Sequence, residues 1–475
     1  MIRVAILHYH LRPGGVTRVI EMAWAALQGQ GVDVLVISGE PPPAETRIPA
    51  SSIQVVPELR YGVSSSEAEN LRLAIEAAER RHWQASADVL HFHNHGLGKN
   101  FALPLAITAW AQAGRRILLN IHDFAENGRP ANYLRLLAEL GGTAGLARCL
   151  YPVAPQVGYA VLTTHDAIRL RRGGLTDDVT LLPNPVALPT GSEAIPRSMF
   201  AADRLVVYPT RSIRRKNIGE ALLWAAWSEP DELVILTCAP VEGLDVVRHA
   251  EWEAFAERLG LRVLFRAQKA LDRSTADFLL TADLCLTTSV AEGFGMAFLE
   301  PWLAGSPLAG RDLPSVTTDF RQAGVALDPL YPRLDVDARS ISAESVREDI
   351  EGNIRHFCAA YEVDFEAGFV ESAFQSVWQG GSVDFGRVGE PHQRLIIEEV
   401  VRSGQKRQLK ADPGAVDRNR ATIQAEFSLE KYGERLMRAY RGLVEVVSET
   451  PDFLDPRGVL QASLAFEDYF ATRNL

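Results

Sequence analysis

Short apolar runs alternate with amphipathic stretches along the first third of the chain. Runs rich in Val, Ile and Leu predict strands at residues 3–9, 32–39, 88–94, 115–123 and 159–165. Their nearly continuous apolar character is typical of strands buried on both faces of a parallel sheet. The stretches 16–31, 67–83 and 98–114 place apolar residues at helical spacing instead. Strands that alternate with helices predict a doubly wound α/β domain.

A Pro-, Gly- and Ser-rich segment at 181–198 then interrupts the pattern. The alternation restarts behind it, with strands expected at 204–211, 232–238, 261–268 and 282–290. We therefore expect two Rossmann-like domains, 1–188 and 189–449, and a helical tail, 450–475, that packs back on the first domain. In such folds ligands bind beyond the carboxyl ends of the strands, so the cleft between the domains is the expected site.

The chain is less regular towards its end. Residues 318–427 are polar and are expected to be mainly irregular, with helical stretches at 342–363 and 392–403. Residues 428–449 predict a clear helix with Ser428 as its N-cap, and 460–473 a further amphipathic stretch.

Composition and charge narrow the class of protein. Hydrophobic residues make up 47% and charged residues 23% of the 475, an ordinary soluble balance without a membrane-length apolar run. The net charge is −11: residues 1–190 hold 17 basic against 16 acidic side chains, and the remainder 32 against 44. This acidic balance disfavours nucleic-acid binding, which needs a basic surface.

Four scattered cysteines and a start without signal-peptide features favour free thiols in the cytoplasm. Contact with a membrane surface and the oligomeric state stay open.

Two glutamates stand eight positions apart in residues 289–302, SVAEGFGMAFLEPW. Glu292 is expected in the loop after a strand, and Glu300 one to two turns into a helix that starts near Gly295. A helical spacing would separate them by roughly 12 Å, similar to the distance from a hexose to the ribose of a nucleotide-sugar. Glycines let a ligand approach the backbone, and a helix N-terminus favours an anion. The alternative is two solvent-facing glutamates around a buried FGMAFL.

A basic turn follows the strand at 204–211, in YPTRSIRRKN (208–217). Arg211 ends that strand, and Lys216 lies just before a helix that begins near Asn217. A guanidinium and an ammonium at the edge of the sheet would suit a diphosphate and offset charge on a leaving group. The alternative is a solvated basic turn. Lysine is scarce, with six in the chain, which favours a functional role for Lys216.

These features resemble a retaining glycosyltransferase of the GT-B fold, closest to family 4 (glycosyl transferases group 1). The matching motifs are GGVTRVI, NIHD, LPNPV, PTRSIRRKN and EGFGMAFLEPWLAGSPL, in that order over residues 1–310. The match is weak over 311–427, where RDLPSVTTDF replaces the usual continuation.

The resemblance implies a role for each matching position. Glu292 lies by the donor sugar, Glu300 holds the ribose, and Arg211 and Lys216 bind the diphosphate. His122 contacts the donor sugar from the first domain. The remaining implied donor contacts are Gly14 and Gly15, facing the donor phosphates and the acceptor, and the backbone near Gly293, Phe294 and Gly295, which meets the sugar. Catalytic roles fall to Glu292, His122, Arg211 and Lys216, with no metal and no cofactor.

The histidines and the glycine pair also have simpler interpretations. A lone histidine such as His122 is more often a residue at a strand end whose hydrogen bonds are satisfied within the protein. The Gly14–Gly15 pair could be only a tight turn. His91, His93 and His95 would share one face of a strand, but without Cys or acidic ligands at suitable spacing a metal site is weakly supported. We place Asn94 and His95 on the acceptor side as a hypothesis.

The expected reaction moves a hexose from a UDP-, GDP- or ADP-sugar to an acceptor that the sequence does not identify: a glycan, a lipid-linked sugar, a small metabolite or a protein. The alternatives are a sugar-nucleotide epimerase or phosphorylase on the same fold, or a non-catalytic sugar-binding protein.

Overall fold

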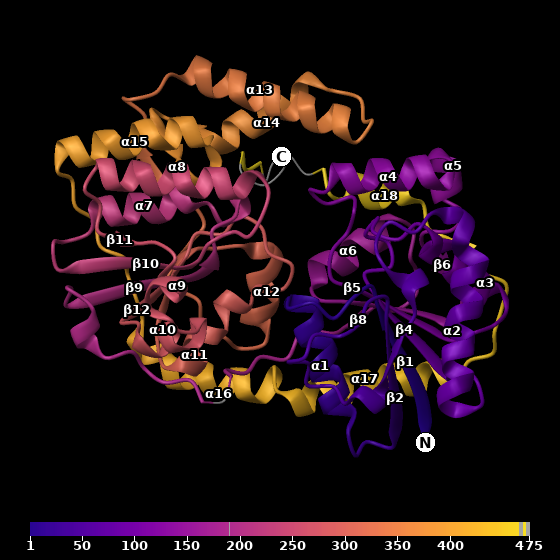
Figure 1. Ribbon diagram of the computed structural model, residues 1–475. Coiled ribbons are helices and arrows are strands. Elements are labelled where there is room, and N and C mark those ends of the chain that lie inside the picture. Colours follow the sequence, from indigo (N-terminus) through magenta and orange to yellow (C-terminus); the bar gives the residue numbers. More distant parts are fainter. Residues whose placement is uncertain (190, 465–468, 472–475) are drawn as a thin grey trace. The chain divides into compact units, whose positions relative to one another are not determined.

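A computed structural model describes residues 1–189, 191–464 and 469–471 (Figure 1). The chain divides into two compact units. The first comprises Met1–Pro185 and Phe427–Leu464, and the second Val186–Glu426 and residues 469–471. Each unit is built on its own parallel sheet with helices on its faces, which confirms the α/β class expected from the alternating pattern.

The first unit has a parallel sheet in the order β3-β2-β1-β4-β5-β7-β8. Its strands are β1 (Ile2–His8), β2 (Val32–Ser38), β3 (Ile53–Val55), β4 (Val89–His93), β5 (Ile117–Ile121), β7 (Val157–Val161) and β8 (Thr180–Leu181). The strand order reverses direction between β1 and β4, whose central residues are fully buried, as their continuous apolar runs require. His8 and His93 end these two strands, at the position where α/β sheets bind ligands.

Helices cover both faces of this sheet. They are α1 (Gly15–Leu27), α2 (Ala68–Trp83), α3 (Ala102–Gln112), α4 (Pro130–Leu140), α5 (Gly142–Leu146), α6 (Thr164–Arg172), α17 (Leu429–Glu445) and α18 (Pro456–Gln461), with single 3₁₀ turns η1 (Ala50–Ser52), η2 (Pro57–Leu59) and η3 (Ser65–Glu67). A short antiparallel pair, β6 (Pro152–Val153) with β18 (Asp452–Phe453), ties the later segment to the unit. Part of the amphipathic stretch expected at 460–473 lies outside the described residues.

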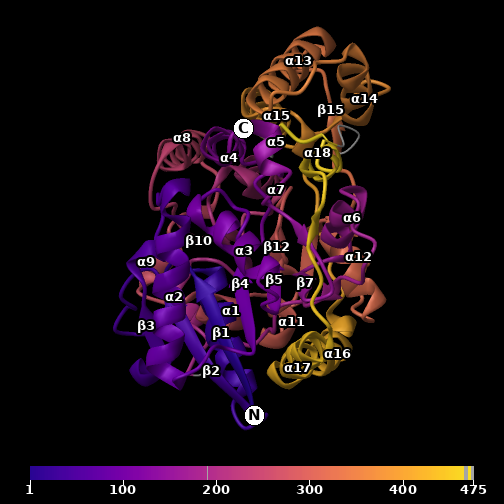
Figure 2. The same cartoon turned by 90° about the vertical axis from the view of Figure 1, so that its right-hand side faces the viewer.

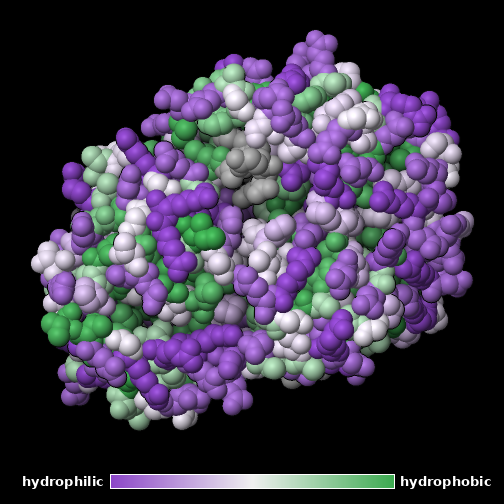
Figure 3. Space-filling model, turned by 180° about the vertical axis from the view of Figure 1, so that it is seen from behind, coloured by the Kyte–Doolittle hydropathy of each residue, from purple (hydrophilic) through white to green (hydrophobic). Residues whose placement is uncertain are grey.

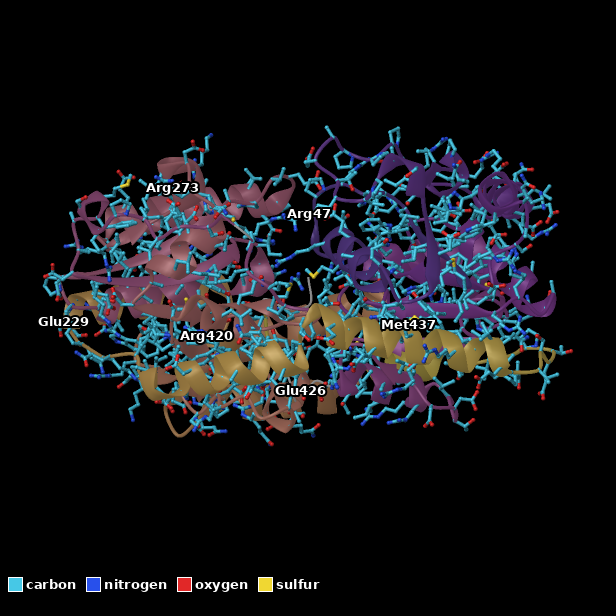
Figure 4. The ribbon with its side chains drawn as sticks, turned by 90° about the horizontal axis from the view of Figure 1, so that it is seen from below. Arg47, Glu229, Arg273, Arg420, Glu426 and Met437 are labelled. Carbon is cyan, nitrogen blue, oxygen red and sulfur yellow. The ribbon has the colours of Figure 1, made fainter. Side chains whose placement is uncertain are left out.

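Helix α17 corrects the expected domain division, which assigned residues 428–449 to the second domain. The helix begins after Ser428, whose hydroxyl accepts a hydrogen bond from the Lys431 N–H, so the predicted N-cap is confirmed. Its apolar face, with Tyr432, Leu436 and Tyr440 fully buried, packs against α1 and joins the core of the first unit. Figure 4 shows α17 within the first unit, with Met437 labelled. An amphipathic pattern predicts that a helix packs but does not identify its partner.

The second unit repeats the arrangement, with strand order β11-β10-β9-β12-β13-β14. The strands are β9 (Arg204–Arg211), β10 (Glu232–Cys238), β11 (Val263–Leu264), β12 (Leu284–Thr287), β13 (Leu308–Arg311) and β14 (Leu330–Tyr331). The helices that accompany this sheet are α7 (Ile218–Trp227), α8 (Leu244–Arg258), α9 (Ala267–Leu271), α10 (Thr275–Thr281), α11 (Glu300–Ala304) and α12 (Pro314–Gln322), with 3₁₀ turns η4 (Arg197–Met199), η5 (Arg214–Lys216) and η6 (Met296–Phe298). Here the order reverses direction between β9 and β12.

Residues 318–427 are more regular than expected. They form α13 (Ala343–Ala360), α14 (Ala367–Val377), α15 (Glu390–Ser403) and α16 (Val416–Glu426), the 3₁₀ turns η7 (Phe385–Arg387) and η8 (Pro413–Ala415), and the antiparallel sheet of β15 (Asp335–Asp337), β17 (Ser382–Asp384) and β16 (Trp378–Gln379). Figure 2 shows α13 and α14 stacked beyond α15.

A buried ion network anchors this segment to the Rossmann core. Arg311, at the end of β13, is fully buried and donates to Glu220 on α7 at 2.7 Å and to Asp384 on β17 at 2.8 Å. The residues are 91 and 73 positions apart in the chain. Since an unpaired buried charge is strongly destabilising, removing one member of the network would leave its partners uncompensated in the core.

The next observations concern the polarity of the surface and the state of the cysteines. Figure 3 shows hydrophilic side chains over most of one face, interrupted by small hydrophobic patches. Within the described ranges, no helix combines the length and apolar character needed to cross a bilayer. All four cysteines are free thiols.

Candidate functional site

The candidate site of the second unit lies where two loops follow neighbouring strands. Strands β9 and β12 pair in parallel, with Val206 opposite Leu284 and Val207 opposite Cys285. The turn 212–217 and the loop 288–299 therefore leave the same edge of the sheet, on either side of the point where the strand order reverses. This is the predicted position for a ligand in a doubly wound sheet.

Lys216 and Glu292 meet at this edge. The Lys216 ammonium donates to the Glu292 carboxylate, and their side chains keep only 13% and 9% of their surface exposed. Burial would raise the pKa of Glu292, but the positive charges of Lys216 and Arg215 outweigh it and hold that pKa below its usual range. The structure thus brings together two of the four residues expected to be catalytic, as a charged pair.

Hydroxyl groups that the sequence analysis missed hold the two loops together. Tyr208 donates to the Lys216 carbonyl at 3.0 Å and shares a hydrogen bond with the Ser289 hydroxyl at 3.0 Å. Thr288 donates to the carbonyls of Lys216 at 3.0 Å and Asn217 at 3.1 Å. The sequence signal is the hydroxyl run 287–289, TTS, which ends three residues before Glu292. Buried hydroxyls at a strand end need partners, and here the partner is the loop carrying Lys216.

Arg211 differs from Lys216 in its surroundings. It ends β9 opposite Cys238, and its side chain is exposed. No side-chain partner of Arg211 is found in the described part of the chain. An exposed guanidinium at the carboxyl edge of the sheet is available for bidentate recognition of an anion. The predicted helix start is confirmed, since α7 begins at Ile218 directly after Asn217.

The stretch from Gly293 to Glu300 is bent rather than one helix. Gly295 has φ +86°, and a Cβ there would lie 2.7 Å from Val316 and 2.9 Å from Phe298, so only glycine fits. A 3₁₀ turn, Met296–Phe298, follows, and α11 starts at Glu300 with Pro301 in its first turn. Proline has no N–H and would clash with the carbonyl four residues earlier, which prevents a continuous helix.

This bend corrects the expected position of Glu300. The side chain is half-buried and belongs to the first residue of α11, not to its second turn. The helix has five residues, so its macrodipole adds little to anion binding. Phe294 is 5% exposed and its ring packs edge-on against Phe320 at 5.4 Å, so only its backbone is available to a ligand. Gly293 is half-buried.

The first unit carries the other expected contacts. Gly14 and Gly15 are exposed at the N-terminus of α1, with Gly14 as the N-cap residue. A Cβ at Gly15 would meet no heavy atom within 4 Å. The glycines therefore leave open backbone at the carboxyl edge of β1.

His122 follows β5 and is 6% exposed. Its backbone N–H donates to the Asn94 side-chain oxygen at 2.7 Å, and its Nε2 lies 2.7 Å from His93 Nδ1. Burial lowers the pKa of His122 to about 4, with Asp123 opposing the shift, so the ring is neutral at pH 7.

The strand-like alternation of side chains expected for HFHNH (91–95) continues only as far as His93. His91 and His93 share a face of β4, with ring centroids 4.5 Å apart. Asn94 then has φ +58°, which turns the chain, and His95 is fully buried with its Nε2 2.8 Å from the Leu150 carbonyl. Asn94 and His95 are thus buried and engaged inside the unit, and their acceptor-side role stays a hypothesis. The described ranges contain no group of three or more His, Cys, Asp or Glu arranged to hold a metal.

Known proteins resemble this chain in sequence and in fold. No model of a known protein family matches the chain. A curated relative, the mannosylglucosyl-3-phosphoglycerate synthase of Petrotoga mobilis, is 25% identical over 386 residues, covering 74% of this chain and 72% of that protein.

Two solved structures share the fold over nearly the whole length. The sucrose-phosphate synthase of Thermosynechococcus elongatus aligns with a TM-score of 0.55 at 14% identity, covering 93% of this chain and 99% of that one. Anabaena HepE in complex with UDP and glucose aligns with a TM-score of 0.53 at 14% identity, covering 93% and 100%. The two parallel sheets and these neighbours show that the chain has the GT-B fold of glycosyltransferases, as the sequence resemblance implied.

Proposed function

We propose that this chain is a retaining glycosyltransferase that moves a hexose from a nucleoside-diphosphate sugar to an acceptor. The observation that carries the proposal is the pair of loops after β9 and β12. They place an exposed arginine, a lysine and an acid with lowered pKa at one edge of the second unit's sheet. The Anabaena neighbour was solved with UDP and glucose, which supports a nucleotide-sugar as the donor.

We assign each expected residue a role in this reaction. Arg211 and Lys216 bind the donor diphosphate and stabilise the charge that grows on it as the sugar bond breaks. Glu292 accepts hydrogen bonds from sugar hydroxyls, and Glu300 from the ribose. From the first unit, His122 contacts the sugar, and the open backbone at Gly14 and Gly15 faces phosphate or acceptor. Retention and membership of family 4 rest on the sequence resemblance. Four free thiols suit a reducing compartment, and a cytoplasmic location is part of the proposal.

The acceptor class follows from the curated relative. Its name describes a glycosylated phosphoglycerate product, so we propose an acceptor with a sugar ring and an anionic group. The carboxyl edge of the first unit offers suitable side chains. Tyr61 is 38% exposed, with its hydroxyl 2.9 Å from His10 Nε2, so this pair can form hydrogen bonds with sugar hydroxyls. Arg12 and Arg129 also act on that hydroxyl, and each is ion-paired, with Glu40 and Asp123 respectively.

A ligand screen tests the proposal. Melting curves with UDP-, GDP- and ADP-sugars should identify one nucleotide that raises the melting temperature, because a ligand bound only by the native state stabilises it. Incubating that donor with glucosyl-3-phosphoglycerate should yield a product with the anomeric configuration of the donor, read by NMR. An epimerised donor in the absence of acceptor would favour an epimerase. Absence of a shift with every nucleotide would contradict the donor site.

A further inference from the structure

The rings of His93 and His122 form a close pair in the first unit. Strands β4 and β5 are parallel neighbours, with His93 opposite Asn120, so the residue ending β4 meets the one following β5. The two rings stack with centroids 5.0 Å apart and planes 17° from parallel. His93 Nδ1 and His122 Nε2 lie 2.7 Å apart, which is a hydrogen bond between two imidazoles.

A hydrogen bond between two neutral imidazoles contains one proton. Burial lowers the pKa of both rings, to about 4 for His122 and well below the ordinary value for His93. Each ring therefore carries a single N–H at neutral pH. Two N–H groups cannot face each other at this distance, and two lone pairs would repel, so one ring donates and the other accepts.

The other nitrogen of His93 decides which ring donates. His93 Nε2 is enclosed and has no hydrogen-bond partner. If His122 donated, His93 would carry its own proton on Nε2, as a buried N–H without an acceptor. If His93 donates from Nδ1, its Nε2 is only a buried lone pair, the less costly arrangement. The proton then lies on His93 Nδ1.

This assignment fixes the tautomer of His122. Its Nε2 accepts from His93, so its proton must be on Nδ1. No partner of that nitrogen is found in the described part of the chain. Since it is also not among the buried polar atoms that lack a partner, it keeps some exposure to solvent. It is therefore the nitrogen of His122 that a ligand can reach.

We propose that His93 is a positioning residue that holds His122 as the Nδ1–H tautomer and presents that N–H as a hydrogen-bond donor to the donor sugar. The proposal rests on the proposed function for the identity of the ligand, but the pairing itself does not. His93 touches no ligand in this scheme and acts only through His122.

NMR tests the tautomer without any assay of activity. Long-range ¹H–¹⁵N correlation of protein labelled with ¹⁵N-histidine distinguishes the two neutral tautomers, and loss of signals in His122→Gln identifies the His122 ring. We expect His122 as Nδ1–H in the wild type and in His93→Asn, whose amide can donate from a position near Nδ1. In His93→Phe, which removes the donor but keeps a planar ring, we expect the Nε2–H form to appear.

Turnover supplies the second readout, with His91→Phe as the matched control. His91 is also fully buried on β4 and stacks on His93, but its Nδ1 pairs with the Tyr440 hydroxyl at 2.8 Å. We expect His93→Phe to lower kcat on the order of 10- to 100-fold, by analogy with the loss of orienting partners of metal-bound histidines. His93→Asn and His91→Phe should stay near the wild-type kcat, and nucleotide affinity should not change.

Two results would overturn the proposal: an Nε2–H tautomer of His122 in the wild type, or a loss of kcat in His91→Phe equal to that in His93→Phe. A wild-type protein with the expected tautomer but no transfer from any nucleotide-sugar would refute the proposed function and leave the pairing intact.

Discussion

Lys216 and Glu292 form an ion pair between loops that follow the adjacent strands β9 and β12. The proposed function gives the lysine to the diphosphate and the acid to the sugar. Under that proposal the ammonium, which has three N–H donors, contacts the carboxylate and the phosphates together. The pair holds both groups in place beforehand, because each would be an uncompensated, largely buried charge without the other.

Separating this pair should affect stability and rate together. Lys216→Met leaves Glu292 without its main cation, so we expect a loss of about 2–3 kcal/mol of unfolding free energy, below the value for fully enclosed pairs. Turnover should fall on the order of 100- to 1000-fold. The double variant Lys216→Met with Glu292→Gln should regain part of the stability but none of the turnover. Denaturant unfolding and steady-state rates of the wild type and these two variants provide the measurement. Equal instability of the single and double variants would show that the pair is not coupled.

Arg211 should affect rate without affecting stability. Its side chain is exposed and without a partner in the described ranges, so Arg211→Lys should change the unfolding free energy by less than about 0.5 kcal/mol. An ammonium cannot reproduce the two-pronged contact of a guanidinium with a diphosphate, so turnover should drop at least about tenfold. Arg273→Lys, at another exposed arginine of the same unit, is the control (Figure 4). Normal kinetics in Arg211→Lys would remove this residue from the site.

The strands could be predicted from the sequence because their apolar runs are local signals. Strand β9 occupies the expected 204–211, β2 ends one residue before its expected end, and β4 is one residue shorter than expected at each end. The meeting of Lys216 with Glu292 could not be predicted in the same way. It depends on β9 pairing with β12, and strand order is a property of the folded sheet.

Other features escaped prediction because they join distant residues. The Arg311 network connects positions 91 and 73 residues apart, and no local pattern identifies the partners of a buried arginine. The break before Glu300 did have a signal, since Pro301 cannot continue a helix from Met296. His93 was considered only as a metal ligand, because its pairing with His122 appears only once β4 and β5 are adjacent.

Glu300 should govern nucleotide affinity rather than the chemical step. If its carboxylate accepts the ribose hydroxyls, Glu300→Ala should weaken binding of the free nucleotide about 10-fold or more, because hydrogen bonds to charged groups contribute roughly 1.5–3 kcal/mol. Glu292→Ala should instead lower kcat, because its contacts lie near the reacting sugar. Titration calorimetry with the nucleotide identified in the melting screen separates the two variants. Unchanged affinity in Glu300→Ala would contradict the ribose assignment.

Transfer should survive chelation of divalent ions. The proposed charge stabilisation comes from Arg211 and Lys216, and these cations do not depend on a metal. Protein treated with EDTA and then desalted should keep its kcat within about twofold. Addition of Mg²⁺ or Mn²⁺ to the treated sample is the control. Activity that disappears with EDTA and returns with either ion would show that a metal bridges the diphosphate.

Mild acid should destabilise the first unit through its buried histidines. Burial lowers the pKa of His8 and His91 to about 3 and that of His122 to about 4, while in the unfolded chain each titrates near 6.5. A depressed pKa means that the unfolded state takes up protons first as the pH falls. The stability is therefore complete above pH 6.5 and is lost towards the folded pKa, by up to about 2 kcal/mol per histidine between pH 7 and 5.

One buried carboxyl acts in the opposite direction. Burial raises the pKa of Glu126 to about 7, so the folded state binds its proton more readily, and this term gains stability as the pH falls from 7 to 4.5. The histidines outnumber it, so the melting temperature should fall from pH 7 to pH 5. His91→Phe removes one titrating group and should make that fall smaller, whatever its effect on stability at pH 7. Melting curves of both proteins at pH 7, 6 and 5 decide the matter. Parallel pH dependence would show that His91 is not kept neutral by the fold.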